Sequence, residues 1–212
     1  MNQLYYLAIP IIIGIISVFF LFGIENDEEV LFSKKNLMEN GSPLLGDPSA
    51  PITILEWGDY QCTYCYRFHQ SSLNIIIEEY VDSGKINLVF KDFPLNGPDS
   101  ILAAEATYCA EDQGKYWSFH NELYSNWAGE RTGWINHDSL NKFAKSVNLE
   151  IGEFTTCLVE HKYKQKVLEL EKFGKEIGID ATPSFLIFND KKIIKIRGNQ
   201  PIDTFRQAID DL

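Results

Sequence analysis

Residues 61–66 read Gln-Cys-Thr-Tyr-Cys-Tyr (QCTYCY), and this stretch decides how the rest of the chain is interpreted. It follows an apolar run at residues 52–57 (ITILEW), which predicts a strand buried on both faces. Apolar residues at helical spacing then predict one helix from the first cysteine to about Val81. A second strand is predicted at residues 86–91 (INLVFK), so the order strand–helix–strand indicates a parallel pair joined by a crossover helix.

The C-x-x-C pair, Cys62 and Cys65, is compatible with three kinds of chemistry. It could be half of a zinc site, but such sites usually need a second closely spaced pair, and Cys109 and Cys157 stand far apart. It could be a purely structural disulfide. The interpretation we favour is redox chemistry: a helix N-terminus stabilises the Cys62 thiolate, which attacks a disulfide, and Cys65 then resolves the mixed disulfide.

Three polar or special residues outside the pair support the redox interpretation, each with a plainer alternative. Burying the Glu56 carboxylate inside an apolar strand costs free energy unless the group has a partner or a function. If it lies near Cys65, its raised pKa would let it accept and return that thiol's proton. Its alternative is a strand-edge side chain facing water. Thr182-Pro183 precedes a strand, where a cis bond would present the Thr182 backbone beside the dithiol; an ordinary trans turn is the alternative. Lys91 either helps to set the local field or is solvated.

Between these motifs, from Pro98 to about Gly174, the sequence pattern predicts helices throughout. Two strands are predicted beyond it, at residues 183–188 and 192–197, forming a hairpin around Asn189-Asp190. Helices are expected at residues 101–112, 116–127, 139–147, in a single segment from about 151 to 174, and at 201–212. The order β-α-β, helical block, β-β-α predicts an α/β thioredoxin-like fold: a mixed central sheet flanked by helices, with an inserted all-helical subdomain.

The N-terminal part differs in kind from the rest. Leu4–Ile24 contains no charged residue, and as a helix it would span about 31 Å, enough to cross a bilayer core. No Lys or Arg precedes this run, which favours one uncleaved transmembrane helix over the alternative of a cleaved signal peptide. Residues 25–46 are expected to be a polar linker, and residues 47–212 the thioredoxin-like domain. We expect a single-pass protein of the cell membrane with this domain on the extracytoplasmic side.

Composition narrows the class of partners. The 212 residues are 45% hydrophobic and 13% aromatic, which is ample for a packed core. The net charge of −11, from 30 acidic and 19 basic residues, argues against nucleic-acid binding, which needs basic surface to neutralise phosphates.

The motifs together resemble DsbA-like thiol–disulfide oxidoreductases of the thioredoxin superfamily, over roughly residues 46–212. The resemblance rests on the active-site region and on later blocks in the same order, namely GDP at 46–48, ITILEW at 52–57, DYQCTYC at 59–65, KDFPL at 91–95, ATPSF at 181–185 and GNQP at 198–201. It implies that Glu56 is the family's buried acid, that Pro183 is its cis-proline, and that residues 98–171 are its helical insertion, which covers the active-site face.

The same resemblance implies a function. Cys62, Cys65 and Glu56 are expected to be catalytic, while Thr182-Pro183 and the dipeptide Thr63-Tyr64 are expected to contact substrate. The enzyme would form or exchange disulfides in secreted or membrane proteins, needing no metal and no cofactor beyond its own dithiol. Its expected partners are unfolded or disulfide-containing proteins and a membrane redox partner that recycles the dithiol.

The dipeptide departs from the Pro-His of strongly oxidising members, so the direction of electron flow stays open. Thr63-Tyr64 with a Thr before the proline is similar to the isomerase branch, but no dimerisation domain precedes the catalytic domain, which favours a monomer. An isomerase or reductase of the same fold is one alternative. A non-catalytic metal- or peptide-binding module is the other.

The remaining cysteines and histidines carry weaker signals. A disulfide between Cys109 and Cys157 would staple the insertion and stabilise it by about 4 kcal/mol in the loop-entropy model. Two buried free thiols or a second redox pair are the alternatives. His69 is expected on a helix surface, and His120, in an aromatic-rich helix, is expected to be a packed or capping histidine.

Overall fold

The computed structural model describes residues 33–212. The transmembrane helix predicted at residues 4–24 and most of the predicted linker lie outside the described residues. Within residues 33–212, none of the helices is long and apolar enough to cross a membrane. A short helix, α3 (Lys34–Met38), opens the described part, and residues 38–212 form one compact unit.

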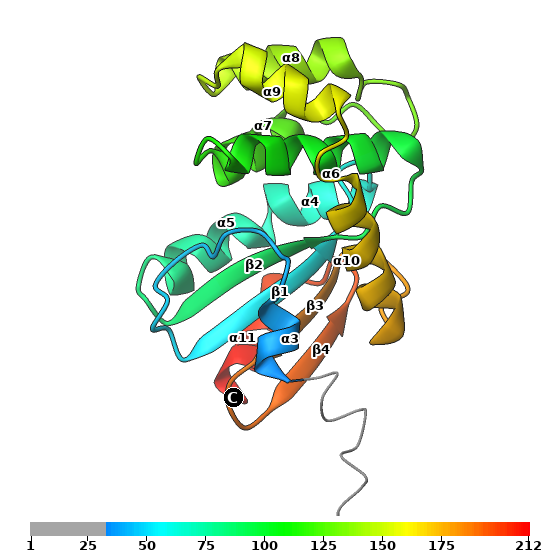
Figure 1. Cartoon of the computed structure of the whole chain (residues 1–212). Helices are drawn as coiled ribbons and strands as arrows, with labels where there is room; N and C mark the ends of the chain where they lie inside the picture. Colours follow the sequence, from blue (N-terminus) through cyan, green and yellow to red (C-terminus); the bar gives the residue numbers. More distant parts are fainter. Residues whose placement is uncertain (1–32) are drawn as a thin grey trace, which may run out of the picture. The chain divides into compact units, whose positions relative to one another are not determined.

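A four-stranded mixed sheet is the centre of this unit, with the order β2-β1-β3-β4 (Figure 1). The strands are β1 (Ile52–Gly58), β2 (Ile86–Asp92), β3 (Ser184–Phe188) and β4 (Ile193–Arg197). β1 pairs with β2 in parallel, and β3 pairs antiparallel with both β1 and β4. All four predicted strands and the predicted hairpin are therefore confirmed, each to within about one residue.

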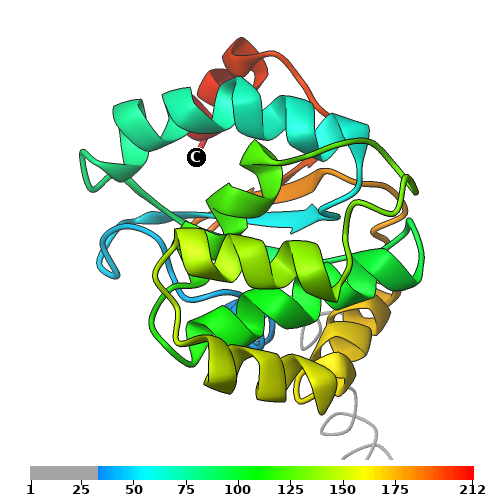
Figure 2. The ribbon, with the colours of Figure 1, turned by 90° about the horizontal axis from the view of Figure 1, so that it is seen from above.

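Helices cover both faces of the sheet, and a helical layer covers the end of the sheet where β1 leads into α4. Figure 2 shows α4, α5 and α11 along one side of the sheet and α10 on the other. The bounds are α4 (Thr63–Gln70), α5 (Ser72–Ile76), the π-helical turn η1 (Ile77–Val81), α6 (Pro98–Glu111), α7 (Tyr116–Ser125), α8 (His137–Ser146), α9 (Ile151–Val159), α10 (Lys164–Glu176) and α11 (Ile202–Asp210). The thioredoxin-like fold with a helical insertion is thus confirmed.

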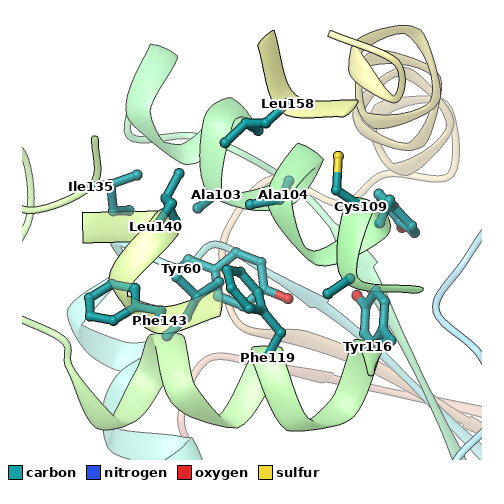
Figure 3. Close-up of a cluster of buried hydrophobic side chains, with 14 of the residues drawn as sticks. Tyr60, Ala103, Ala104, Cys109, Tyr116, Phe119, Ile135, Leu140, Phe143 and Leu158 are labelled. Carbon is teal, nitrogen blue, oxygen red and sulfur yellow. The ribbon is translucent and has the colours of Figure 1, made fainter. Parts of the chain in front are cut away.

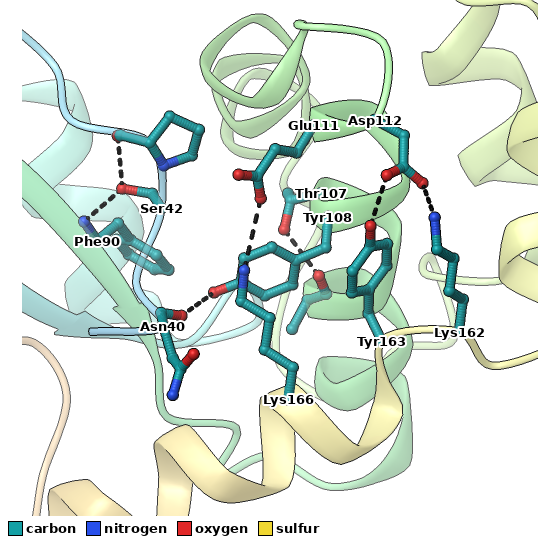
Figure 4. Close-up of polar contacts among 12 residues, drawn as sticks. Asn40, Ser42, Phe90, Thr107, Tyr108, Glu111, Asp112, Lys162, Tyr163 and Lys166 are labelled. Carbon is teal, nitrogen blue, oxygen red and sulfur yellow. Dashed lines mark hydrogen bonds and ion pairs between the residues drawn. The ribbon is translucent and has the colours of Figure 1, made fainter.

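Two predicted helices are wrong in their continuity. The helix expected over residues 62–81 breaks at Ser71, whose φ of −124° and ψ of −85° are not helical. The apolar spacing continues across this break, so the sequence pattern does not reveal it. The single helix expected over residues 151–174 is two helices, because His161 adopts a left-handed φ of 51° after α9. The turn between them is fixed by Asp112, which accepts hydrogen bonds from Lys162 and Tyr163 (Figure 4).

The start of the domain also differs from the prediction. Residues 38–46 were expected to be linker, yet they belong to the compact unit. The amide of Ser42 donates to the Phe90 carbonyl at 2.8 Å. The Ser42 hydroxyl accepts the Phe90 amide at 2.9 Å (Figure 4). Leu45 forms an isolated antiparallel bridge with Leu88. Such single backbone pairs leave no periodic signature in the sequence, which is why the segment reads as a linker.

Two hydrophobic clusters hold the unit together. One lies between the sheet and α4, α5 and α11. The other fills the helical insertion, where side chains from α6, α7, α8 and α9 converge on Phe119 and Leu140 (Figure 3). Tyr60, Cys62 and Cys65 belong to this second cluster. The core of the insertion is therefore continuous with the C-x-x-C motif.

Candidate active site

The turn between β1 and α4 places Cys62 at the N-cap of α4. The buried Asp59 carboxylate fixes this turn by accepting the amides of Gln61 and Asn96, each at 2.8 Å. The Cys62 amide donates to the Asp59 carbonyl at 3.0 Å. Cys62 therefore sits at a turn fixed by hydrogen bonds, followed by the amides of the first helical turn, which have no carbonyl partner within the helix.

Cys62 is set up to be a thiolate. Cys62 and Cys65 are both free thiols in this structure. The pKa of Cys62 is lowered to about 6, first by a hydrogen bond from the Cys65 thiol and further by Thr182 and by the backbone amides of Tyr64 and Cys65. These contacts outweigh burial, which acts in the opposite direction. At neutral pH the thiolate is consequently the main form of Cys62.

Cys65 has the opposite character. Its side chain is fully buried, and burial is the main reason that its pKa lies well above the usual value for a thiol. The neighbouring Cys62 and Glu56 raise the pKa further. The pair thus has one sulfur that readily carries negative charge and one that resists it. Within residues 33–212, no group of three or more His, Cys, Asp and Glu side chains is placed to hold a metal ion.

Glu56 lies on β1, an inner strand of the sheet, opposite Phe90 of β2 and Phe185 of β3. It is 3% exposed, so the alternative of an edge residue facing water is wrong. Burial, followed by the charge of Cys62, raises the pKa of Glu56 to about 8. Glu56 is therefore protonated at neutral pH and holds a proton close to the buried pair.

The Thr182–Pro183 peptide bond is cis, so the alternative of an ordinary trans turn is wrong. It brings the Thr182 carbonyl to 3.4 Å from Cys62 Sγ, although the two residues are 120 positions apart. Thr63 is half-buried, and Tyr64 is 56% exposed on the first turn of α4. Thr182-Pro183 therefore lies directly against the dithiol, and Tyr64 extends into solvent beside it.

Lys91 does not take part in this site. It is fully buried, so the expectation of a solvated lysine is wrong. Because Lys91 is in register with Trp57, strand alternation places it on the face of the sheet opposite Glu56. Its ammonium donates to the Glu39 carbonyl and lies 5.5 Å from the centre of the Phe173 ring. Burial lowers the pKa of Lys91 to about 8.

Both histidines near the site are packed. His69 is only 8% exposed, so its expected surface position is wrong; its Nε2 lies 3.1 Å from Asn121 Oδ1. His120 is buried with its Nδ1 2.9 Å from the Tyr60 hydroxyl, which confirms the packed role. Burial lowers the pKa of both imidazoles, so both are neutral at pH 7.

In the structure, Cys109 on α6 and Cys157 on α9 form a disulfide, with their Cα atoms 5.9 Å apart. This disulfide joins two helices of the insertion, and neither of its cysteines lies on α4, the helix that carries the C-x-x-C pair. The two cysteine pairs therefore differ: one is a closed cross-link, and the other is an open dithiol at a helix N-terminus.

Several residues of the site were missed by sequence reasoning. Gln61 is buried, and its side chain donates to Ser100 Oγ at 2.8 Å and accepts the Arg131 amide at 2.8 Å. Trp127 donates to the Gln61 carbonyl at 2.9 Å, and Glu130 accepts the Thr63 amide at 2.8 Å. The position of Gln61 beside the motif was its only signal. Glu130 and Arg131 come from the segment between α7 and α8 and have no local signal, and Trp127 was recognisable only as one of a run of aromatic residues.

The match to known families agrees with this geometry. Residues 38–211 match the family model described as Thioredoxin. The chain belongs to the thioredoxin family. The match begins where the compact unit begins, so it covers the whole of the unit but its last residue.

Similar proteins show to which group within the thioredoxin family this chain belongs. "Probable disulfide bond formation protein D" of Bacillus cereus is 29% identical over 211 residues, covering 96% of this chain and 91% of that protein. Oxidised BdbD of Bacillus subtilis is 26% identical with a TM-score of 0.71, covering 80% of this chain and 91% of that one. Wolbachia pipientis alpha-DsbA1 is 30% identical with a TM-score of 0.72, covering 82% and 92%. The chain is a DsbA-like thiol–disulfide oxidoreductase of the thioredoxin family.

Proposed function

We propose that this chain is a membrane-anchored, extracytoplasmic oxidoreductase that introduces disulfides into secreted or membrane proteins. The observation that carries the proposal is the asymmetric placement of the pair: Cys62 lies at the N-cap of α4, which favours a thiolate, and Cys65 is fully buried, which favours a thiol. A stabilised Cys62 thiolate favours the reduced enzyme, and an enzyme that is stable when reduced is a strong oxidant of other thiols.

The reaction begins with the Cys62–Cys65 disulfide. A substrate thiolate attacks Cys62 Sγ, the Cys62–Cys65 bond breaks, and the electron pair leaves on Cys65. A second substrate thiolate then attacks the substrate sulfur of the mixed disulfide, and Cys62 leaves as a thiolate. The substrate loses two electrons and gains a disulfide, and the enzyme gains them as a dithiol. A membrane redox partner returns the dithiol to the disulfide.

Glu56 handles the proton in this scheme. Cys65 leaves as a thiolate in a buried position where its charge is disfavoured. Glu56, protonated at neutral pH, supplies the proton to Cys65 and recovers it when the dithiol is oxidised again. We assign substrate binding to Thr182-Pro183, whose carbonyl lies against Cys62, and to Thr63 and the exposed Tyr64 beside it.

The proposed location rests on sequence and on the second disulfide. The uncharged segment Leu4–Ile24 supports a single transmembrane anchor through the lipid bilayer. The Cys109–Cys157 disulfide supports an oxidising compartment, since such bonds persist mainly outside the cytosol. We further propose that the enzyme acts as a monomer and needs no nucleic acid, metal or organic cofactor.

The test is a redox titration of the full-length chain in detergent micelles with glutathione buffers, with both cysteine pairs followed by mass after alkylation. A potential near or above about −150 mV, with oxidative refolding of a reduced substrate protein, supports the oxidase. A value near about −270 mV would indicate a reductase instead. Cys65→Ser should accumulate a mixed disulfide with substrate, and Cys62→Ser should not. A pair that never cycles would refute the enzyme and favour a binding module.

A further inference from the structure

A carboxylate from the helical insertion shares the N-terminus of α4 with Cys62. Glu130 Oε1 accepts the backbone amide of Thr63 at 2.8 Å, although the two residues are 67 positions apart. Thr63 is the first residue of α4, so its amide is one of the donors that have no partner within the helix. Thr63 also directly follows Cys62 in the sequence. The N-terminus of α4 stabilises the Cys62 thiolate, and Glu130 places a negative charge at this same helix end.

The position of Glu130 is fixed from both sides along the chain. Before it, the Trp127 indole donates to the Gln61 carbonyl at 2.9 Å and stacks on Tyr66, with the ring centres 4.5 Å apart and the planes within 9°. After it, the Arg131 amide donates to Gln61 Oε1 at 2.8 Å. The segment that carries Glu130 is thus bonded to the active-site turn, although the Glu130 side chain itself is exposed.

Two anions at one helix end interact unfavourably. The Cys62 thiolate draws on the amides of Tyr64 and Cys65, and the Glu130 carboxylate takes the amide of Thr63. Each anion is favoured by the helix N-terminus, but each raises the free energy of the other. The Cys62–Cys65 disulfide is neutral, so Glu130 meets this repulsion only when the pair is reduced. The carboxylate therefore favours the disulfide form over the dithiol.

We propose that Glu130 is a positioning residue that sets the redox poise of Cys62–Cys65, making the pair a weaker oxidant than its motif alone would give. The proposal rests on the proposed thiol–disulfide exchange by this pair. The reduction potential of the pair would then depend on a residue of the helical insertion as well as on the Thr63-Tyr64 dipeptide. Glu130 itself neither attacks a disulfide nor transfers a proton.

The test uses Glu130→Gln in the full-length chain, because the amide oxygen of Gln still accepts the Thr63 amide while the charge is lost. We expect the equilibrium constant with glutathione to shift about threefold toward the dithiol, because repulsion between a thiolate and an exposed carboxylate is weakened by solvent. That shift corresponds to about 14 mV at 29.6 mV per tenfold. The pKa of Cys62, read from thiolate absorbance at 240 nm, should fall by about half a unit.

Matched variants separate charge from structure. Glu130→Asp keeps the charge and should stay closer to the unmodified chain than Glu130→Gln. Glu78→Gln makes the same change in net charge at an exposed position on η1 and should leave both readouts unchanged. The Glu130→Gln shift should also shrink in 1 M KCl, where the screening length falls to about 3 Å.

The outcomes distinguish this proposal from the proposed function. If Cys62 and Cys65 of the unmodified chain do not exchange disulfides with glutathione, the proposed function fails. The absorbance titration of the Cys62 thiolate still decides whether Glu130 affects the pKa of Cys62. The proposal about Glu130 is overturned if Glu130→Gln leaves the pKa of Cys62 unchanged, raises it, or moves it no more than Glu78→Gln does. A shift that persists undiminished at high salt would also overturn it, because a structural effect would then be responsible.

Discussion

Replacing Glu56 with Gln should make the protein more stable and less active at neutral pH. The pKa of Glu56 is raised from 4.5 to about 8 in the folded protein, mainly by burial. The folded state therefore keeps the proton, whereas the unfolded chain releases it above about pH 4.5. Ionisation favours unfolding, so this residue costs no stability below pH 4.5 and an increasing amount as pH rises toward 8.

The size of the effect follows from the width of that window. One pKa unit corresponds to 1.36 kcal/mol, so the cost of Glu56 is about 1 kcal/mol at pH 5 and about 3 kcal/mol at pH 7. Gln resembles protonated Glu in shape and never ionises. Any pH-independent cost of burying its amide cancels when two pH values are compared. The advantage of Glu56→Gln in unfolding free energy should therefore grow by about 2.5 kcal/mol between pH 5 and pH 7.

The assay is denaturant unfolding of both proteins at pH 5, 6 and 7 in reduced glutathione, with alkylation and mass confirming that only Cys62 and Cys65 are reduced. The titration of Cys62 is common to both proteins and drops out of the comparison to first order. In parallel, substrate oxidation by Glu56→Gln should slow, because the buried Cys65 thiolate loses its proton donor. A stability difference that stays constant from pH 5 to pH 7 would refute the raised pKa and the proton-transfer role together.

Three further outcomes are expected. Because the Cys65 thiol is the main cause of the lowered Cys62 pKa, thiolate absorbance of the reduced chain should titrate near pH 6, and Cys65→Ala should raise that midpoint by roughly one unit. Replacing Cys109 and Cys157 together by Ala should lower the unfolding free energy by about 4 kcal/mol in denaturation, a loss that a single Ala plus alkylation should reproduce. Lys91→Met should raise the unfolding free energy by about 2.5 kcal/mol more at pH 7 than at pH 10, because the folded protein pays for a charged, buried amine at pH 7, where its pKa of about 8 leaves it protonated. Equal gains at both pH values would contradict this.

Local patterns explain what could be predicted from the sequence. The strands at residues 52–58 and 184–188 are short apolar runs with clear ends. Pro183 directly precedes the second strand, and Cys62 and Cys65 follow the first by four and seven positions. Sequence adjacency to a buried strand is therefore what made these residues recognisable. Glu56 stood out for the same reason, as a charge inside such a run.

The rest depended on contacts that leave no local trace. Glu130 reaches the active site from 67 positions away, in a segment whose polar composition resembles that of any loop. Lys91 is the last residue of the apolar run predicted as a strand, where solvent exposure is the ordinary expectation. Its burial follows from its contact with the backbone of Glu39, which lies far away in the sequence. The break at Ser71 leaves the apolar stripe intact on both sides. In each case tertiary packing decided the outcome against the local preference.

An open sheet edge can capture an extended segment of another chain and seed aggregation. Here the backbone of Ser42 and Leu45 occupies the outer edge of β2. The opposite edge, β4, is short and carries Lys195 and Arg197, charges that discourage pairing with another strand. Both margins of the sheet are thereby protected against strand addition, so that an extended segment meeting this domain is not recruited into a growing β-sheet.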